Sequence, residues 1–270
     1  MTSPKPVVIA NLWGQLRQFT DARIALGRTG ASLPTQPQLA FQLAHAQARD
    51  AVHQALDVPR LLQDMVAAGL QEPCVLHSAV TDRLQYLQRP DLGRRLDAPS
   101  RERLKSLSPA PGAGWDIAIV IADGLSSLAV AQNAVPLLVA LRRLLADDVR
   151  VAPPVVVEQG RVAIGDEIGE LLGARLVLLL IGERPGLSSP DSMGAYLTWA
   201  PRVGLTDASR NCVSNIRPAG LPWDEAAVKV HYLLSEIQSR QLSGVGLKDE
   251  SADALRVTGS HHGNFLLGPS

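Results

Sequence analysis

A glycine- and proline-rich turn near residue 185 carries side chains that could bind a polar ligand. The segment Gly182-Glu-Arg-Pro-Gly-Leu187 follows an apolar run and presents a carboxylate and a guanidinium in a tightly shaped loop. Glu183 could accept hydrogen bonds from the amide or hydroxyl groups of a ligand. The alternative is a strand-end turn with a solvent-facing ion pair, and the residues alone leave both interpretations open.

A second candidate is Gly160-Arg-Val-Ala-Ile-Gly-Asp166, which precedes a predicted helix. Backbone N–H groups at the start of a helix can meet a polar ligand, and Val162 could pack on a flat apolar face. The alternative is an ordinary strand–helix connection in which Asp166 balances the helix dipole, and the sequence alone favours this alternative.

The remaining reactive residue types do not form a catalytic set. Cys212 lies in an apolar stretch without a neighbouring His or Lys, so a small side chain packed in the core or against a ligand is favoured over a nucleophile. The histidines are scattered, and His261 and His262 suggest only a weak metal site in the C-terminal tail. We therefore expect neither catalytic residues nor a metal site.

The common nucleotide and hydrolase motifs are also absent. Asp123-Gly-Leu-Ser126 follows an apolar run, but the chain has no G-x-G-x-x-G, no Walker A sequence and no G-x-S-x-G. A stand-alone nucleotide-binding enzyme is therefore disfavoured.

Composition indicates a soluble globular protein of a reducing compartment. The 270 residues are 46% hydrophobic and 19% charged with zero formal net charge, which gives no general attraction to nucleic acid or anionic membranes. Two isolated cysteines and the lack of a signal-peptide core predict a cytoplasmic protein.

Apolar runs alternate with helical patterns in the second half of the chain. Strands are predicted at 116–122, 154–157, 175–182 and 211–216, and helices at 126–146, 164–172 and 224–242, with Pro136 expected to kink or split the first of these helices. This alternation predicts an α/β fold with a mainly parallel, Rossmann-like sheet flanked by helices.

The chain is expected to divide into four parts. Residues 1–105 form a smaller, mostly helical N-terminal region, 106–114 a Pro/Gly-rich linker, 115–248 the Rossmann-like domain, and 249–270 a tail. Ligands bind beyond the carboxyl ends of parallel strands, which places Val162 and Glu183 at one rim. Cys212 fits this rim less well, because it lies near the start of its strand.

Several segments in consistent order resemble the ethanolamine ammonia-lyase small subunit. They are Gly27-Arg-Thr-Gly30, Tyr86-Leu-Gln-Arg-Pro-Asp-Leu-Gly-Arg-Arg95, Asp123-Gly-Leu-Ser126, the run 160–174, Gly182-Glu-Arg-Pro-Gly-Leu187 and Cys212-Val-Ser-Asn-Ile216. The resemblance covers about residues 16–247.

The resemblance implies a subunit of a lyase that converts ethanolamine to acetaldehyde and ammonia by adenosylcobalamin-dependent radical chemistry. In that family a TIM-barrel large subunit carries the substrate and catalytic side chains, in a hexamer of large–small pairs. The implied cobalamin contacts are Val162, Glu183 and Cys212. The chain would be inactive alone.

Two further expectations come from this resemblance. The base-off motif D-x-H-x-x-G is absent, which agrees with a family that keeps the cofactor's own dimethylbenzimidazole as lower ligand. The short N-terminus argues against packaging in a bacterial microcompartment. A non-enzymatic assembly or solubility partner of a large subunit, docking through the arginine-rich stretch 89–95, is the alternative function.

Overall fold

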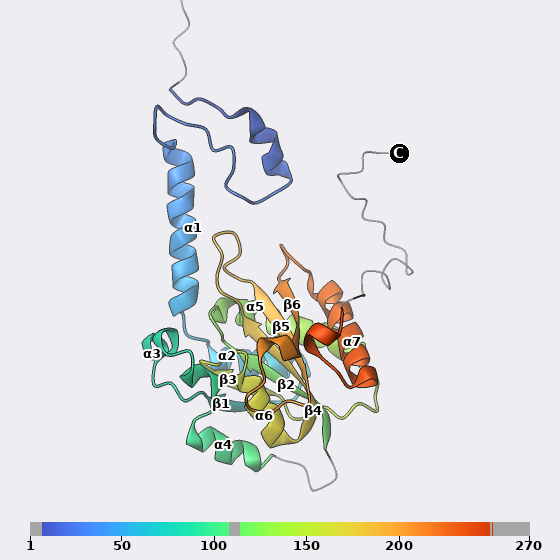
Figure 1. The fold of residues 1–270 in the computed structure, drawn as a ribbon. Helices are drawn as coiled ribbons and strands as arrows, with labels where there is room; N and C mark the ends of the chain where they lie inside the picture. The colour runs from blue at the N-terminus through green and yellow to red at the C-terminus, as the bar shows by residue number, and fades with distance from the viewer. Residues whose placement is uncertain (1–6, 108–113, 249, 251–270) are drawn as a thin grey trace, which may run out of the picture.

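A single six-stranded sheet organises the chain, in a computed structural model that describes residues 7–107, 114–248 and 250. The strands are β1 (Cys74–His77), β2 (Trp115–Ala122), β3 (Val155–Glu158), β4 (Ala174–Gly182), β5 (Met193–Trp199) and β6 (Arg210–Ile216). Their order is β1-β3-β2-β4-β5-β6 (Figure 1). The first four strands are mutually parallel, whereas β5 runs antiparallel to both β4 and β6.

Helices cover both faces of the sheet. The α-helices are α1 (Thr35–His53), α2 (Val58–Ala67), α3 (Arg83–Gln88), α4 (Ala98–Lys105), α5 (Ser127–Arg142), α6 (Ile164–Leu172) and α7 (Trp223–Arg240). Short 3-10 helices are η1 (Leu12–Gln18), η2 (Leu92–Arg94), η3 (Asp207–Ser209) and η4 (Gly244–Gly246). Apolar side chains of α2, α5 and α7 pack on one face, and those of α4 and α6 on the other.

The alternating apolar side chains of β2 and β4 explain this two-sided core. Ile117, Ile119 and Ile121 point to the α5 face, whereas Ala118 and Val120 point to the α6 face. Strands of this kind are buried on both sides, as their continuous apolar sequence predicts. The α/β class is confirmed.

The sheet is mostly parallel, as predicted, but it is mixed, because β5 forms antiparallel pairs with both neighbours. Two strands were not predicted from the sequence: β5, whose glycine and polar residues interrupt its apolar pattern, and β1, which has four residues. The observed strand order also differs from the 3-2-1-4-5-6 order of a Rossmann fold, so the narrower Rossmann-like prediction is not confirmed.

The helix after β2 is continuous through Pro136 and ends at Arg142 rather than residue 146, so the proline does not split it. Proline removes the donor to the carbonyl of Gln132, which lies at an exposed position where water can hydrate it. Ser126 caps this helix, accepting a hydrogen bond from the N–H of Ala129.

The expected boundary near residues 106–114 does not separate the sheet from the N-terminal region. Strand β1 lies before the boundary and pairs with β3, and α2 and α4 pack on the two faces of the sheet. Residues 108–113 of the linker, and the tail at 249 and 251–270 with His261 and His262, lie outside the described residues. The division into domains stays a prediction.

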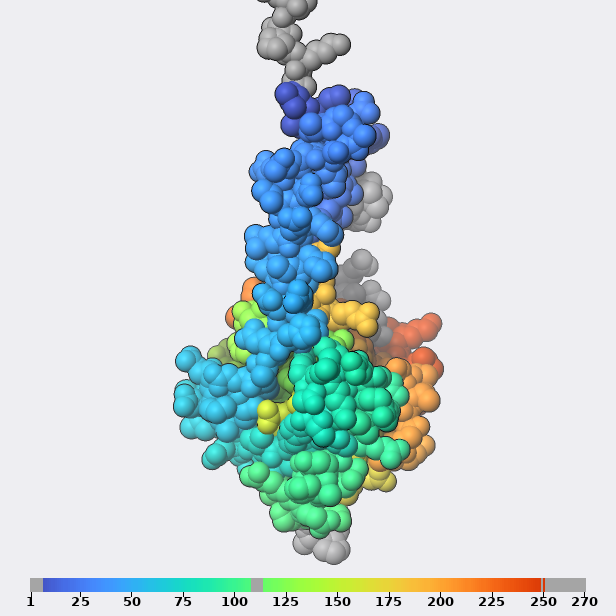
Figure 2. Space-filling model, turned by 90° about the vertical axis from the view of Figure 1, so that its left-hand side faces the viewer, coloured from blue at the N-terminus to red at the C-terminus, as the bar shows by residue number. Residues whose placement is uncertain are grey.

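An N-terminal arm, here residues 7–33, lies beyond the first turn of α1 and projects from the body of the molecule (Figures 1 and 2). No residue of its 3-10 helix η1 is buried. The arm and α1 expose large apolar side chains: Val7, Leu12, Trp13, Leu16, Phe19, Leu33, Leu39, Phe41 and Leu43. An accumulation of this kind is typical of a surface that binds another molecule.

Candidate functional site

Two glycines bring the ends of β2 and β4 into contact. Gly124 has a φ of +60°, and a Cβ atom there would lie 2.3 Å from the carbonyl oxygen of Gly182. A Cβ atom at Gly182 would lie 2.0 Å from the carbonyl oxygen of Ser126. Only glycine permits this approach, which is closed by a hydrogen bond of 3.0 Å from the N–H of Leu125 to the carbonyl of Gly182.

The loop that carries Val162 is held by hydrogen bonds to α3 and to the following 3-10 helix η2. The N–H of Arg161 donates to the carbonyl of Gly93 at 2.7 Å, and the hydroxyl of Tyr86 donates to the carbonyl of Gly160 at 3.0 Å. The guanidinium of Arg161 also lies over the Tyr86 ring, 4.1 Å from its centroid. These contacts fix the backbone on which Val162 lies half-buried.

Asp123, which directly follows β2, ties the same loop to α3. Its carboxylate accepts hydrogen bonds from the N–H of Gly160 at 3.2 Å and from the guanidinium of Arg83 at 3.2 Å. Burial raises the pKa of Asp123 to about 6, against the lowering effects of Arg83 and of backbone N–H groups. The loop therefore rests on a buried, titratable ion pair.

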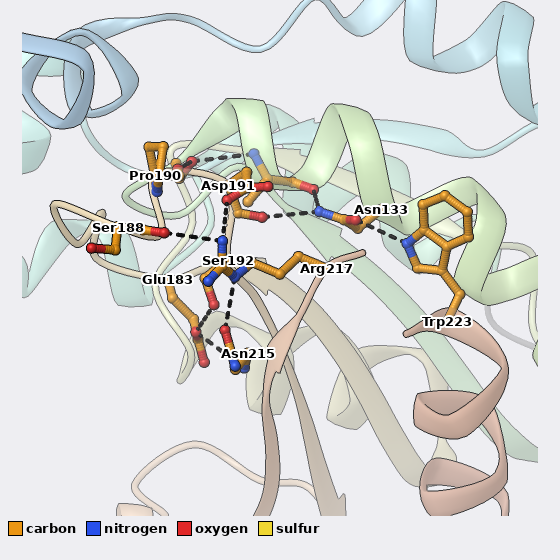
Figure 3. Close-up of polar contacts among 11 residues, drawn as sticks. Asn133, Glu183, Ser188, Pro190, Asp191, Ser192, Asn215, Arg217 and Trp223 are labelled. Carbon is orange, nitrogen blue, oxygen red and sulfur yellow. Dashed lines mark hydrogen bonds and ion pairs between the residues drawn. The ribbon is translucent and has the colours of Figure 1, made fainter. Parts of the chain in front are cut away.

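Glu183 is the first residue after β4, and its carboxylate is oriented by two donors. The Ser192 hydroxyl donates to its Oε2 at 2.5 Å, and the N–H of Asn215 donates to the same oxygen at 3.3 Å (Figure 3). The side chain is half-buried. The alternative interpretation of this loop involved a solvent-facing ion pair, but a pair between Glu183 and Arg184 is not among the contacts that the structure gives for the described residues.

The Val162 and Glu183 loops line one small pocket of about 140 Å³. Its lining residues are Tyr86, Gly124, Leu125, Arg161, Val162, Ile181, Gly182, Glu183, Arg184 and Tyr196. The pocket thus combines a carboxylate acceptor, guanidinium donors and apolar surface. Arg161 also contributes a buried Nε without a hydrogen-bond partner in the described part of the chain.

Cys212 lies outside this pocket but beside its wall. It pairs in register with Tyr196 on β5, and its thiol is hydrogen-bonded to that side chain. Burial among its neighbours raises the pKa of the Cys212 thiol, the hydrogen bond with Tyr196 lowers it, and the charge of Glu183 raises it. The residue is nevertheless exposed overall. A neutral thiol is suited to packing rather than to nucleophilic attack.

Comparison with known proteins identifies the family. The family model of the ethanolamine ammonia-lyase light chain (EutC) matches residues 10–248. An ethanolamine ammonia-lyase small subunit of Azotobacter vinelandii is 60% identical over 260 residues, which cover 96% of each chain. A small subunit of Ralstonia nicotianae is 58% identical, and the match covers 96% of each chain. A small subunit of Pseudomonas aeruginosa is 57% identical, and the match covers 95% of this chain and 94% of the relative.

This chain belongs to the ethanolamine ammonia-lyase small-subunit family. The resemblance inferred from the sequence is thereby confirmed. A family of small subunits implies a large-subunit partner.

Several residues around the pocket of this family member were not predicted from the sequence. Tyr196 was missed because β5 was not identified, and Ser192 because only tertiary structure brings it to Glu183. Tyr86 and Asn215 were quoted only as parts of motifs. Asp166 lies in the first turn of α6, where its charge can balance the helix dipole, and it also forms a buried ion pair with Arg210 at 2.5 Å that was not predicted.

The described residues contain neither a cluster of metal-ligating side chains nor a helix that could span a membrane. These residues contain no group of three or more His, Cys, Asp or Glu side chains that could hold a metal ion. Within the same part of the chain, every helix is too short or too polar to cross a membrane.

Proposed function

We propose that this chain forms one wall of an adenosylcobalamin pocket in an ethanolamine ammonia-lyase complex, with Val162, Glu183 and Cys212 as cofactor contacts. The observation that carries the proposal is that Val162 and Glu183, 21 positions apart in the sequence, line one pocket whose wall residue Tyr196 pairs with Cys212. The identity of the proposed ligand, adenosylcobalamin, is taken from the family to which the chain belongs.

The donor set fits a corrin. Corrin side-chain amides can donate hydrogen bonds to Glu183 and accept them from Arg161 and Arg184, which also line the pocket. Val162 and Tyr196 offer apolar contact to the ring system. The pocket of about 140 Å³ is far smaller than a corrin, so the cofactor would lie across this surface and be covered by a second polypeptide.

In this arrangement the chain binds and orients the cofactor and contributes no catalytic residue. When bound, adenosylcobalamin supplies radical chemistry, by which the complex would convert ethanolamine to acetaldehyde and ammonia. Glu183 would fix the position of the corrin through hydrogen bonds, and Val162 and Cys212 would exclude water from its face.

The partner in this proposal is the large subunit, which would carry substrate and catalytic side chains in a hexamer of large–small pairs. The exposed apolar side chains of the arm and α1 support a chain that buries surface against another polypeptide. A cytoplasmic location stays a prediction.

Titration of the co-expressed large–small pair with adenosylcobalamin tests the proposal, with the corrin absorption band as the readout. We expect Glu183→Ala to weaken cofactor binding about tenfold or more, as for loss of a charged hydrogen bond. Glu236→Ala is the matched control, because Glu236 lies on α7 and pairs with Arg240. The isolated chain should release no ammonia from ethanolamine, and adding the large subunit and cofactor should restore release.

Two results would count against the proposal. Ammonia release by the isolated chain at the rate of the complex would show that the chain is an enzyme by itself. Cofactor affinity that is unchanged in Glu183→Ala, with the pair still assembled, would favour the alternative role of an assembly or solubility partner.

A further inference from the structure

We propose that Arg217 is a positioning residue for cobalamin recognition, which orients Glu183 by joining the end of β6 to the loop between β4 and β5. The proposal rests on the function proposed above. Arg217 touches no residue assigned as a cofactor contact, and it acts through Asn215 and the 187–191 stretch.

The two carboxylate oxygens of Glu183 have different surroundings. Oε2 accepts both hydrogen bonds, from Ser192 and from the N–H of Asn215, whereas the structure gives Oε1 no partner among the described residues. Oε1 lies against Gly194, where an added Cβ atom would be 3.0 Å away. The carboxylate is thereby held by one oxygen, and the other can accept a hydrogen bond from a ligand.

Asn215 donates to Glu183 from an unusual backbone conformation. Its φ is +59°, in the left-handed region that asparagine tolerates better than most residues. The following turn is tight, because Leu221 donates to the Asn215 carbonyl at 2.8 Å and a Cβ atom at Gly220 would lie 2.5 Å from that oxygen. A partner that holds the Asn215 side chain would help to fix this conformation.

Arg217 is that partner. Its side chain is almost completely buried, and its Nε donates to the Asn215 Oδ1 at 3.0 Å (Figure 3). Its NH1 donates to the Ser188 carbonyl at 3.1 Å and to the Asp191 carboxylate at 3.2 Å. One guanidinium thus fixes both the residue that donates to Glu183 and the loop that ends in Ser192.

The same loop is also held by Asn133 and by Ser126, the residue that caps α5. Asn133 on α5 donates to the Asp191 carbonyl at 3.0 Å and accepts a hydrogen bond from the Trp223 indole at 2.9 Å (Figure 3). Ser126 donates to the Pro190 carbonyl at 2.7 Å. Loss of the Arg217 contacts would therefore leave the loop attached to α5, and its end paired with β6 through Met193 and Ile216. It would remove the side chain that joins Asn215 to Ser188 and Asp191.

Lysine is the informative replacement, because it keeps the charge and much of the length of arginine. An ammonium group is a single point, whereas the guanidinium places N–H groups toward three acceptors in a fixed plane. Arg217→Lys retains pairing with Asp191 and loses the directed hydrogen bond to Asn215. The variant should fold while weakening the orientation of Glu183.

The test is a double-mutant cycle on the co-expressed large–small complex, titrated with adenosylcobalamin and followed at the corrin absorption band. We expect Arg217→Lys to weaken binding about tenfold and to raise the KM for adenosylcobalamin more than it lowers kcat. In a Glu183→Ala background the same change should weaken binding less than about twofold, because its effect passes through Glu183. Arg150→Lys is the matched control, since Arg150 donates to Asp116 from two nitrogens at the opposite end of β2.

The outcomes separate this proposal from the proposed function. Unchanged affinity in Glu183→Ala would overturn both. If Glu183→Ala weakens binding but Arg217→Lys does not, or if the two losses simply add, Arg217 has no positioning role and the proposed function stands. Equal loss of affinity in Arg150→Lys would show a general structural effect and would also overturn the role of Arg217.

Discussion

The two loops that line the pocket are held in different ways. The Val162 loop rests on the buried pair of Asp123 and Arg83, whose side chains are 4% and 16% exposed. The 183–192 loop is fastened partly by buried groups and partly by the exposed residue Arg23 of the N-terminal arm. A buried polar network is costly to break, whereas an exposed one contributes little stability. One side of the pocket is therefore built into the core, and the other is connected to the periphery.

Removal of Arg83 should produce the largest effect. The Arg83 guanidinium donates to Asp123 and, through Nε at 2.8 Å, to the carbonyl of Val52. Arg83→Ala leaves the buried Asp123 carboxylate without its ion-pair partner, which should lower the free energy of unfolding at pH 7 by about 3–5 kcal/mol. Urea unfolding of the purified chain measures this. A loss below about 1 kcal/mol would mean that the Val162 loop does not depend on the pair.

A smaller effect is expected from the titration of Asp123. Because its folded-state pKa of about 6 lies above the ordinary value of 3.8, the folded chain binds this proton more tightly than the unfolded chain. The contribution of Asp123 to stability is therefore greatest below pH 4 and falls as the pH rises through 6. Since each tenfold difference in proton affinity corresponds to about 1.4 kcal/mol, the whole contribution amounts to about 3 kcal/mol.

Asp123→Asn isolates this contribution, because asparagine keeps an oxygen that can accept from Gly160 and does not titrate. Between pH 4 and pH 7 the variant should gain about 2–3 kcal/mol relative to the unmodified chain in urea unfolding. A difference that stays constant over this range would show that Asp123 does not titrate there.

The sequence predicted the parts of this arrangement that local pattern determines. The apolar runs of β3 and β4 and the glycine-containing loops that follow them predicted that Val162 and Glu183 lie close together, and both line one pocket. The antiparallel β5 was not predicted in this way, because glycine and polar residues interrupt the apolar pattern of Met193–Trp199. Only its pairing with β4 and β6 identifies it as a strand. The role of Tyr196 as a wall residue depends on that pairing.

The polar networks were equally hidden from sequence reading. Arg83 meets Asp123 across 40 positions, and Arg217 meets Asp191 across 26, so spacing along the chain carries no signal for either contact. Both arginines stand close to motifs that the resemblance identified. In both cases an arginine near such a motif supports a loop that is distant from it in the sequence.

The smallest effect on the free energy of unfolding is expected for Arg23, the exposed residue that binds the 183–192 loop. Its guanidinium donates to the Leu187 carbonyl at 3.1 Å and to the Ser188 hydroxyl at 3.2 Å, and both hydrogen bonds are exposed. Arg23→Ala should change the free energy of unfolding of the chain by no more than about 0.5 kcal/mol in urea unfolding. Arg60→Ala, which removes an exposed pair with Asp64, provides a control of the same kind. A loss of unfolding free energy close to that of Arg83→Ala would show that the arm stabilises the pocket as strongly as the buried pair does. The contrast between the two loops would then disappear.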